Sequence, residues 1–452
     1  MPDASFLTAA AVVLSVWAVV LWRVGPNAAL GAAVLVASLF PTWVKTSMLG
    51  LPVDCRTFVA GIGLLWICVD RRGRIRSPIV LLDLLVAGLV VWQFLSDSRA
   101  DGLAASHAVR SYGEWAFPYL AGRLALRSSV ETASVTPWGA ATLAVLGLLT
   151  LVEPVLRANP YDVIFGPPGD AEFPRDVMRY GVKRAMGPTE HPIFLGAVLL
   201  LLMPWAVSLW QSRQKRGLAA AALVLGMAGI LATLSRGPVM GLMIAAVTLT
   251  AVRWPKLRWP VGVVGGLLMA TVLVFPTKTA LALSRLTNED RQRTDVEIGG
   301  VRYEMSGTLQ RVQLVRAYWP AFRSAGPLGY GTRKVKGFPP KVPNLPENRR
   351  TREMLRIVDN SYLLLGLRLG WVGAGLLLAI LITAAVSALR LADDRTLLGL
   401  PGAMGSVLVA MIPLLLTVYL AYEFAFELIA VCGFAGSLAS ADKASRIGRP
   451  LT

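Results

Sequence analysis

Arg236 lies in a turn whose residues suggest anion binding. Leu234-Ser235-Arg236-Gly237-Pro238 joins two apolar segments with almost no loop. Ser235 suits the N-cap of the second segment, and Pro238 suits its first turn. The free amides of a helix N-terminus attract anions, and Arg236 would add a forked donor beside them. The turn therefore predicts phosphate or diphosphate binding at a membrane surface; a tight turn with an arginine reaching the interface is the alternative.

Arg311 and Arg316 flank a second feature, an apolar stripe at helical spacing. Its members are Leu309, Val312, Val315, Trp319 and Phe322. Such a stripe predicts an amphipathic helix lying at the outer membrane interface. Either one of the two arginines lies over a lipid-borne phosphate, or both are solvated on a helix that only docks to the membrane.

Asp359 stands where a long loop enters the next apolar segment, in Val358-Asp359-Asn360-Ser361-Tyr362. A carboxylate at a membrane boundary near several arginines is a candidate general base. Aspartate is also a favoured N-cap, so Asp359 could equally begin the following helix. His191, between Glu190 and Pro192, presents the same choice between a site residue and the start of a helix.

The sequence predicts no metal site and no cofactor. Two histidines are too few for a multi-histidine metal site, and the three cysteines lack CxxC spacing. Gly326-Pro327-Leu328-Gly329-Tyr330-Gly331 resembles a phosphate loop only loosely, because no lysine follows at Walker spacing and no βαβ unit surrounds it. Gly329 and Gly331 more readily allow a tight chain reversal.

The elements that must position these residues are membrane helices. Of the 452 residues, 55% are hydrophobic and only 16% are charged, whereas soluble proteins have about 25% charged residues. The apolar runs match the roughly 20 residues that cross a hydrocarbon layer as helix. We expect an all-α polytopic membrane protein with about 12–13 transmembrane helices, near residues 5–22, 27–44, 53–69, 78–95, 106–126, 135–152, 192–210, 217–234, 237–252, 259–275, 361–389, 397–417 and 421–439. Segment 106–126 is the weakest, because His107, Arg110, Glu114 and Arg123 interrupt it.

Basic clusters between these segments predict the orientation. Clusters of Lys and Arg follow the third, seventh, ninth and eleventh segments, and a further cluster lies at the C-terminus. With thirteen segments all of them face one side, which the positive-inside bias makes cytoplasmic. The expected divisions are N-terminal helices (1–152), an external loop (153–191), central helices (192–275), a large basic periplasmic loop (276–360), C-terminal helices (361–440) and a cytoplasmic tail (441–452). The large loop holds sixteen Lys/Arg against eight Asp/Glu, but loops of this length escape the bias.

The net charge of +18 does not indicate nucleic-acid binding. Part of it lies in the short loops, and the sequence has no basic face rich in aromatic residues. The basic stretch 332–357 would attract acidic lipid headgroups or glycans, or would simply be solvated. We expect membrane lipids, and no nucleic acid, among the partners.

In their order, these pieces resemble the O-antigen ligase and O-antigen polymerase family of bacterial membrane glycosyltransferases. The resemblance runs from Glu190 to about Gly373 and rests on Glu190-His191-Pro192, Ser235-Arg236-Gly237, Arg311 with Trp319, Gly329-Tyr330-Gly331, Asp359-Asn360-Ser361 and Gly370-Trp371-Val372-Gly373. It implies glycosyl transfer at the outer face of the bacterial inner membrane without a metal or nucleotide sugar. The implied donor is a glycan on undecaprenyl pyrophosphate, the acceptor is a glycan, and a chain-length regulator is a candidate partner.

The resemblance also implies residue roles. Arg236 and Arg311 would hold the pyrophosphate, and Asp359 would be the catalytic base. The expected substrate-binding residues are Arg316, His191, Asn360, Tyr362, Gly329 and Gly331. Many ligases of the family have His-Asn where this chain has Asp359-Asn360, and this departure favours a polysaccharide or exopolysaccharide polymerase over a ligase.

Other functions stay open at this point. A ligase-type transferase is the nearest. A transporter or flippase would need ionisable residues deep in several helices around a cavity; the main candidates, Asp83, Glu114, Arg123 and Arg368, mostly lie near segment ends. A cell-wall glycan polymerase of the shape, elongation, division and sporulation type also uses an external aspartate, but its motifs are absent. Glu423 and Glu427 in the last segment are either functional or paired with arginines.

Overall fold

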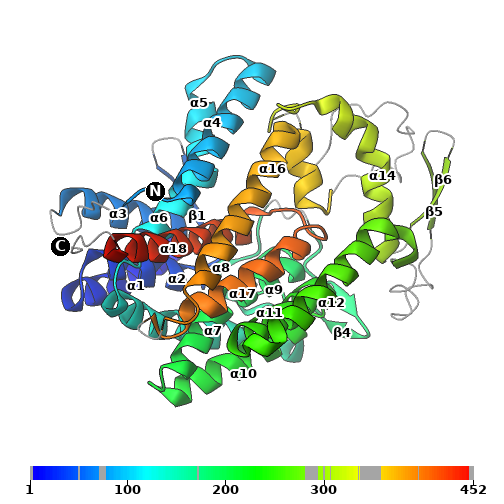
Figure 1. The fold of residues 1–452 in the computed structure, drawn as a ribbon. Coiled ribbons are helices and arrows are strands. Elements are labelled where there is room, and N and C mark those ends of the chain that lie inside the picture. Colours follow the sequence, from blue (N-terminus) through cyan, green and yellow to red (C-terminus); the bar gives the residue numbers. More distant parts are fainter. Residues whose placement is uncertain are drawn as a thin grey trace.

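The structure, a computed structural model, is an α-helical bundle with three short antiparallel hairpins (Figure 1). It describes residues 4–48, 51–70, 78–169, 173–279, 294–298, 301–305, 307–333, 335, 358–394 and 397–446. The predicted all-α membrane fold class is confirmed. Three predicted features lie outside the described residues: the basic cluster within 71–76, nearly all of the stretch 332–357, and the last residues of the tail.

Each predicted apolar segment contains a helix. The helices are α1 (Ala4–Arg23), α2 (Pro26–Ala37), α3 (Cys55–Val69), α4 (Leu81–Asp101), α5 (Ala105–Ser111), the π-helix η2 (Tyr112–Ala116), α6 (Phe117–Arg123), α7 (Ser129–Leu156), α8 (Pro160–Phe165), α9 (Pro192–Gln211), α10 (Arg216–Ala232), α11 (Arg236–Arg253), α12 (Pro255–Val274), α14 (Gly307–Ala325), α16 (Ser361–Arg390), α17 (Leu400–Leu414) and α18 (Tyr422–Arg446). The strands are β1 (Lys45–Met48), β2 (Leu51–Asp54), β3 (Met178–Arg179), β4 (Val182–Lys183), β5 (Thr294–Ile298) and β6 (Val301–Met305).

Within the described residues, 6 helices are long and apolar enough to cross a membrane: α1, α4, α7, α9, α16 and most of α18. Four more apolar helices are shorter, namely α2, α3, α10 and α17. The 12 residues of α2 rise only about 18 Å, against a hydrocarbon thickness of about 30 Å. Because Pro41 has no amide proton to donate, the chain cannot extend this helix as the predicted segment 27–44 required. The number of crossings stays a prediction.

The weak segment 106–126 is broken into α5, η2 and α6. Its charged groups reach partners on α4. Arg123 pairs with Asp83 at 2.9 Å, and Gln93 donates to Glu114 at 2.7 Å. These ionisable residues therefore tie neighbouring helices together.

Helix α9 forms the centre of the bundle. It is buried along almost its whole length and contacts α7, α10, α17 and α18 (Figure 1). Trp205 is fully buried between the α7 backbone at Gly139 and the ring of Phe434. A Cβ at position 139 would collide with the Trp205 ring. Glycine in α7 thus lets the central helix approach.

Contacts among the loops show that α9, α11 and α16 run in the same direction. Ser208, near the end of α9, donates to the Leu398 carbonyl at 3.1 Å, in the connection after α16. Arg258, just after α11, lies 3.9 Å from Asp393 in that same connection. The C-terminal ends of the three helices therefore lie together, and so do their N-terminal ends at the opposite side of the bundle. Three of the five predicted basic clusters, those after α9, α11 and α16, are thus at one end of the bundle, and the predicted orientation in the membrane stays a prediction.

A buried ion triad joins α3 to α18. Arg56, only 2% exposed, lies 3.2 Å from Asp54 and 2.5 Å from Glu427. It also donates to the Glu423 carbonyl at 2.8 Å. Of the two alternatives for Glu427, pairing with an arginine is therefore the one observed.

We predict that Arg56→Met destabilises the protein more than Glu427→Gln does. The first change leaves two buried carboxylates without a cation, which costs about 3–5 kcal/mol. The second leaves Arg56 paired with Asp54. The measurement is the unfolding midpoint temperature of each variant in detergent, with the exposed Arg253→Met as a control. A larger fall for Glu427→Gln would contradict this account of the triad.

Candidate active site

The turn that carries Arg236 begins α11, as predicted. Ser235 occupies the N-cap position and Pro238 the first helical turn. The Ser235 hydroxyl, however, does not cap the helix: it donates to the Thr233 carbonyl at 3.2 Å and accepts from Arg184. The first amides of α11 consequently receive no side-chain acceptor from the N-cap residue.

A small hairpin between α8 and α9 covers this turn. Strands β3 and β4 are joined by Tyr180 and Gly181, which both have positive φ, as a two-residue hairpin turn requires. Arg179 donates to the Leu234 carbonyl at 2.7 Å. The hydrogen bond from Arg236 to the Tyr180 hydroxyl lowers the pKa of Tyr180. The hairpin thus contacts Arg236 through the hydroxyl of Tyr180.

Arg184, directly after this hairpin, is a site residue that the sequence did not reveal. It donates to the Thr233 carbonyl at 3.0 Å and to the Ser235 hydroxyl at 2.7 Å. Burial, and then the charges of Arg179 and Arg311, lower the pKa of Arg184 to about 10. Guanidinium groups from the segment between α8 and α9 and from α14 are therefore gathered in one region.

Asp359 lies beside Arg311 at the start of α16. Burial raises the pKa of Asp359, and the positive charge of Arg311 acts in the opposite direction. Asn360, not Asp359, is the N-cap: its side-chain oxygen accepts from the Leu363 amide at 2.9 Å. The prediction that Asp359 could be the cap is wrong, because the helix begins one residue later. The Asp359 carboxylate is therefore not used as a cap.

The residues after α17 hold these two helix starts together. The Ser361 amide donates to the carbonyls of Leu415 and Val418 at 2.8 and 3.0 Å, and its hydroxyl donates to Val418 at 2.6 Å. At the start of α11, a Cβ on Gly237 would lie 2.8 Å from Leu414. Close packing on one short segment thus brings the Arg236 turn and the Asp359 turn to the same end of the bundle.

Helix α14 brings Arg311 to this end by packing on α16 (Figure 1). The predicted helix is confirmed, but its buried face is different. Leu314, Ala317, Tyr318 and Ala321 are buried, whereas Trp319, placed on the predicted stripe, is 44% exposed. The small alanines let α14 approach α16 closely, and Gly366 of α16 leaves room for the Phe322 ring. Arg311 is half-buried in this arrangement.

Gly329 and Gly331 pack against a break in α16, and their predicted binding of substrate stays a prediction. The helix is interrupted at Gly370, which has φ +74°. The amides of Tyr330 and Gly331 donate to the Leu367 and Arg368 carbonyls, both at 2.8 Å. Gly329 packs so closely against α16 that a Cβ at this position would collide with the α16 backbone. The chain reversal predicted for this loop is therefore a docking contact between backbones.

His191 begins α9, which was one of its two predicted roles. Its Nδ1 accepts from the Ile193 amide at 3.2 Å, and its ring lies against Phe173 and Phe194. Burial, helped by the charges of Arg184 and Arg311, lowers the pKa of His191 to about 3. The ring is consequently neutral, with its proton on Nε2.

The remaining predicted substrate residues make structural contacts. Arg316 is exposed on α14, about 140° around the helix from Arg311, and donates to the Thr277 hydroxyl at 2.7 Å. Tyr362 donates from its hydroxyl to the Ile412 carbonyl of α17 at 3.0 Å. Neither contact brings the side chain to Asp359, so substrate binding by these residues stays a prediction.

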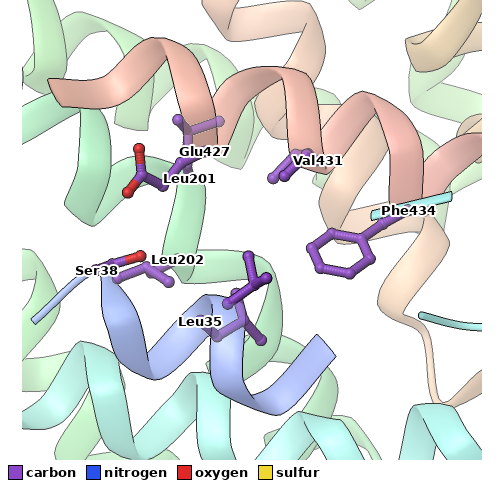
Figure 2. A pocket seen from close by; sticks show the side chains of 9 residues that line it. Leu35, Ser38, Leu201, Leu202, Glu427, Val431 and Phe434 are labelled. Atoms are coloured by element: carbon purple, nitrogen blue, oxygen red, sulfur yellow. The ribbon is translucent and has the colours of Figure 1, made fainter. Parts of the chain in front are cut away.

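A cavity of about 10 Å³ lies between α2, α9 and α18, with Ser38, Glu427 and Phe434 in its lining (Figure 2). This is close to the room that one water molecule needs and far too small for a sugar. It contains none of the residues predicted for the site. Within the described part of the chain, no three His, Cys, Asp or Glu side chains are grouped to hold a metal ion.

We predict that Asn360 acts by capping α16. Asn360→Asp and Asn360→Ser should keep the stability of the protein, whereas Asn360→Ala should cost about 1 kcal/mol. Unfolding midpoints in detergent test this order. If the aspartate variant kept full stability but lost donor binding, the amide would be a substrate ligand rather than a cap.

A family model described as O-antigen ligase matches residues 221–378. The matched segment runs from α10 into α16 and includes Arg236, Arg311 and Asp359. No curated protein shows a significant match to the chain. The O-antigen ligase family consists of membrane glycosyltransferases. The match therefore supports the interpretation of this protein as an enzyme, and together with the apolar helices it indicates a multi-pass bacterial membrane protein. The resemblance to the O-antigen ligase family, recognised from the sequence motifs, is confirmed by this match over residues 221–378.

Proposed function

We propose that the protein transfers a glycan from undecaprenyl pyrophosphate to a glycan acceptor at the periplasmic face of the inner membrane. One observation carries the proposal: Arg311 lies beside Asp359 and is also close to Arg184, at the end of the bundle where α9, α11 and α16 begin. A carboxylate beside several guanidinium groups suits a reaction in which a hydroxyl loses its proton while a diphosphate leaves.

The arginines are suited to the leaving diphosphate. A guanidinium group stays charged and binds phosphate oxygens through two parallel N–H groups. Arg236 stands in the first turn of α11, where the helix N-terminus adds partial positive charge. Arg311 lies nearer the carboxylate. Together they would neutralise the charge that develops on the diphosphate as its bond to the sugar breaks.

Asp359 is better suited than His191 to be the base. His191 accepts an amide proton at Nδ1, and its pKa of about 3 leaves it a very weak base. The carboxylate of Asp359 is not used in capping, and burial raises its pKa toward the range in which a carboxylate removes a proton effectively.

The step balances without a redox partner. The acceptor hydroxyl attacks the anomeric carbon of the donor sugar and gives its proton to Asp359. A new C–O bond forms at that carbon, and the bond to the diphosphate oxygen breaks. The diphosphate leaves with the bonding electron pair, held by Arg236 and Arg311.

Polymerase and ligase are the two candidate forms of this reaction. The family description favours a ligase. Asp359, where many ligases have histidine, favours transfer to a growing polysaccharide or exopolysaccharide, because the shorter side chain changes how the acceptor can approach. The two forms differ in product: a polymerase yields a ladder of chain lengths, and a ligase yields a single addition to its acceptor.

We predict that purified protein in detergent joins undecaprenyl-pyrophosphate-linked oligosaccharides, and that Arg236→Ala and Arg311→Ala each lower the rate by about 10²–10³-fold. Loss of one group that stabilises a developing charge typically has this effect. The measurement is gel analysis of the glycan products at matched protein amounts.

Arg253→Ala, at the other end of α11, is the matched control and should leave the rate unchanged. Full activity of Arg236→Ala and Arg311→Ala would remove their proposed role. A wild-type protein that moves the lipid across vesicles but never joins glycans, with either a glycan or a lipid acceptor supplied, would point to a flippase.

We predict that activity depends on the ionisation of Asp359. A base works as carboxylate, so the rate should fall as the pH drops through the raised pKa of Asp359 and should level off above it. Because the charge of Arg311 lowers this pKa, the residual activity of Arg311→Ala should need a still higher pH. Asp359→Asn should lose nearly all activity while the N-cap at Asn360 is kept. A rate that stays constant down to the ordinary pKa of an aspartate would exclude Asp359 as the base.

A further inference from the structure

The hairpin of the first external loop lies outside the segment that matches the family, yet it reaches the proposed diphosphate site. Arg179 and Arg184 both donate to the turn that precedes α11. The family segment begins at residue 221, so these two arginines are not part of it. What they do there is a separate question from the roles of Arg236 and Arg311.

Arg184 keeps N–H groups that are available for a ligand after it has made its two hydrogen bonds to the turn before α11. A guanidinium group carries five N–H donors. Nε donates to the Thr233 carbonyl, and Nη2 donates once to the Ser235 hydroxyl. Among the described residues, the other guanidinium N–H groups of Arg184 meet no hydrogen-bond acceptor, and the side chain is only half-buried. The guanidinium can therefore bind an anion without releasing the turn.

Arg184 lies close to both arginines of the proposed site. The charge of Arg311 acts on Asp359 and also on Arg184. Arg184 also contacts Ser235, the neighbour of Arg236 in the chain. An anion that reaches from Arg311 toward Arg236 would therefore pass Arg184.

Grouping like charges in this way has a cost that an anion would remove. Arg179 and Arg311 both disfavour the charged form of Arg184, and among the residues that the structure describes no carboxylate acts on it. Repulsion of this kind persists in a folded protein when a bound anion offsets it. The phosphate nearer the sugar would lie toward Arg311 and Asp359, which leaves the second phosphate near Arg184.

We propose that Arg184, next to the hairpin that carries Arg179, binds the second phosphate of the polyprenyl diphosphate and so distinguishes this lipid from a polyprenyl monophosphate. The inference rests on the proposed function and adds a specificity residue from the other external loop. A monophosphate lipid whose single phosphate lies at Arg311 and Asp359 would leave Arg184 without its anion. The competing explanation is that Arg184 only braces the turn through Thr233 and Ser235.

The experiment measures dissociation constants of undecaprenyl pyrophosphate and undecaprenyl monophosphate for the purified full chain in one detergent. Arg184→Ala should weaken binding of the pyrophosphate lipid by roughly 10- to 100-fold, as expected for lost hydrogen bonds between charged groups. Binding of the monophosphate lipid should change little. Ser235→Ala removes the side-chain half of the brace, the hydrogen bond from Nη2, and keeps the charge of Arg184, so its ratio of the two constants should stay near that of the wild type. Arg253→Ala controls for the loss of one positive charge.

Two results would overturn the inference. The first is an Arg184→Ala variant that keeps the wild-type ratio of the two dissociation constants. The second is a Ser235→Ala variant that loses discrimination as fully as Arg184→Ala, because the brace alone would then explain the effect. If instead the wild-type protein binds neither lipid and joins no glycans, it is the proposed function that fails.

Discussion

The break in α16 at Gly370 is the constraint on which the arrangement of the site depends. A helix interrupted inside a membrane bundle leaves carbonyl groups that must find donors within the protein. Here the Leu367 and Arg368 carbonyls accept from the backbone of the 326–331 loop. Trp92 of α4 donates to the Leu369 carbonyl at 2.9 Å. The same contacts fasten the end of α14 beside the first part of α16. They therefore set how the helix of Arg311 lies against the helix that Asp359 precedes.

Local patterns in the sequence predicted the helices that carry the site residues. Which contacts those residues make depends on packing between segments far apart in the chain. Apolar periodicity gave the helix around Arg311, and the Ser-Arg-Gly-Pro order gave the start of α11. The contribution of Arg184 was missed, because strands of two residues are too short to show alternation. Only the Tyr180-Gly181 pair hinted at that hairpin. Asp359 and Asn360 were not separable as caps, since both residue types cap equally well.

The chemistry of guanidinium explains why arginine, rather than lysine, supplies the charges at this end of the bundle. Burial and two neighbouring cations lower the pKa of Arg184 to about 10, and the group is still fully charged at neutral pH. A lysine begins from a pKa of about 10.4, so the same surroundings would bring its pKa to about 8 and part of its positive charge would be lost at slightly alkaline pH. Arginine therefore keeps its full charge among neighbouring cations over a wider range of pH than lysine would.

Arg311 has to meet two opposing requirements, which makes the burial of Asp359 part of the proposed mechanism. A guanidinium close enough to stabilise the leaving diphosphate also stabilises the Asp359 carboxylate and so weakens it as a base. Burial acts in the opposite direction and is the larger of the two effects on the pKa of Asp359. A more exposed aspartate beside the same arginine would hold its proton less strongly and remove the acceptor's proton less effectively. Because Asn360 caps α16, the carboxylate of Asp359 is not occupied as a cap. Its strength as a base then depends on the balance between burial and the charge of Arg311.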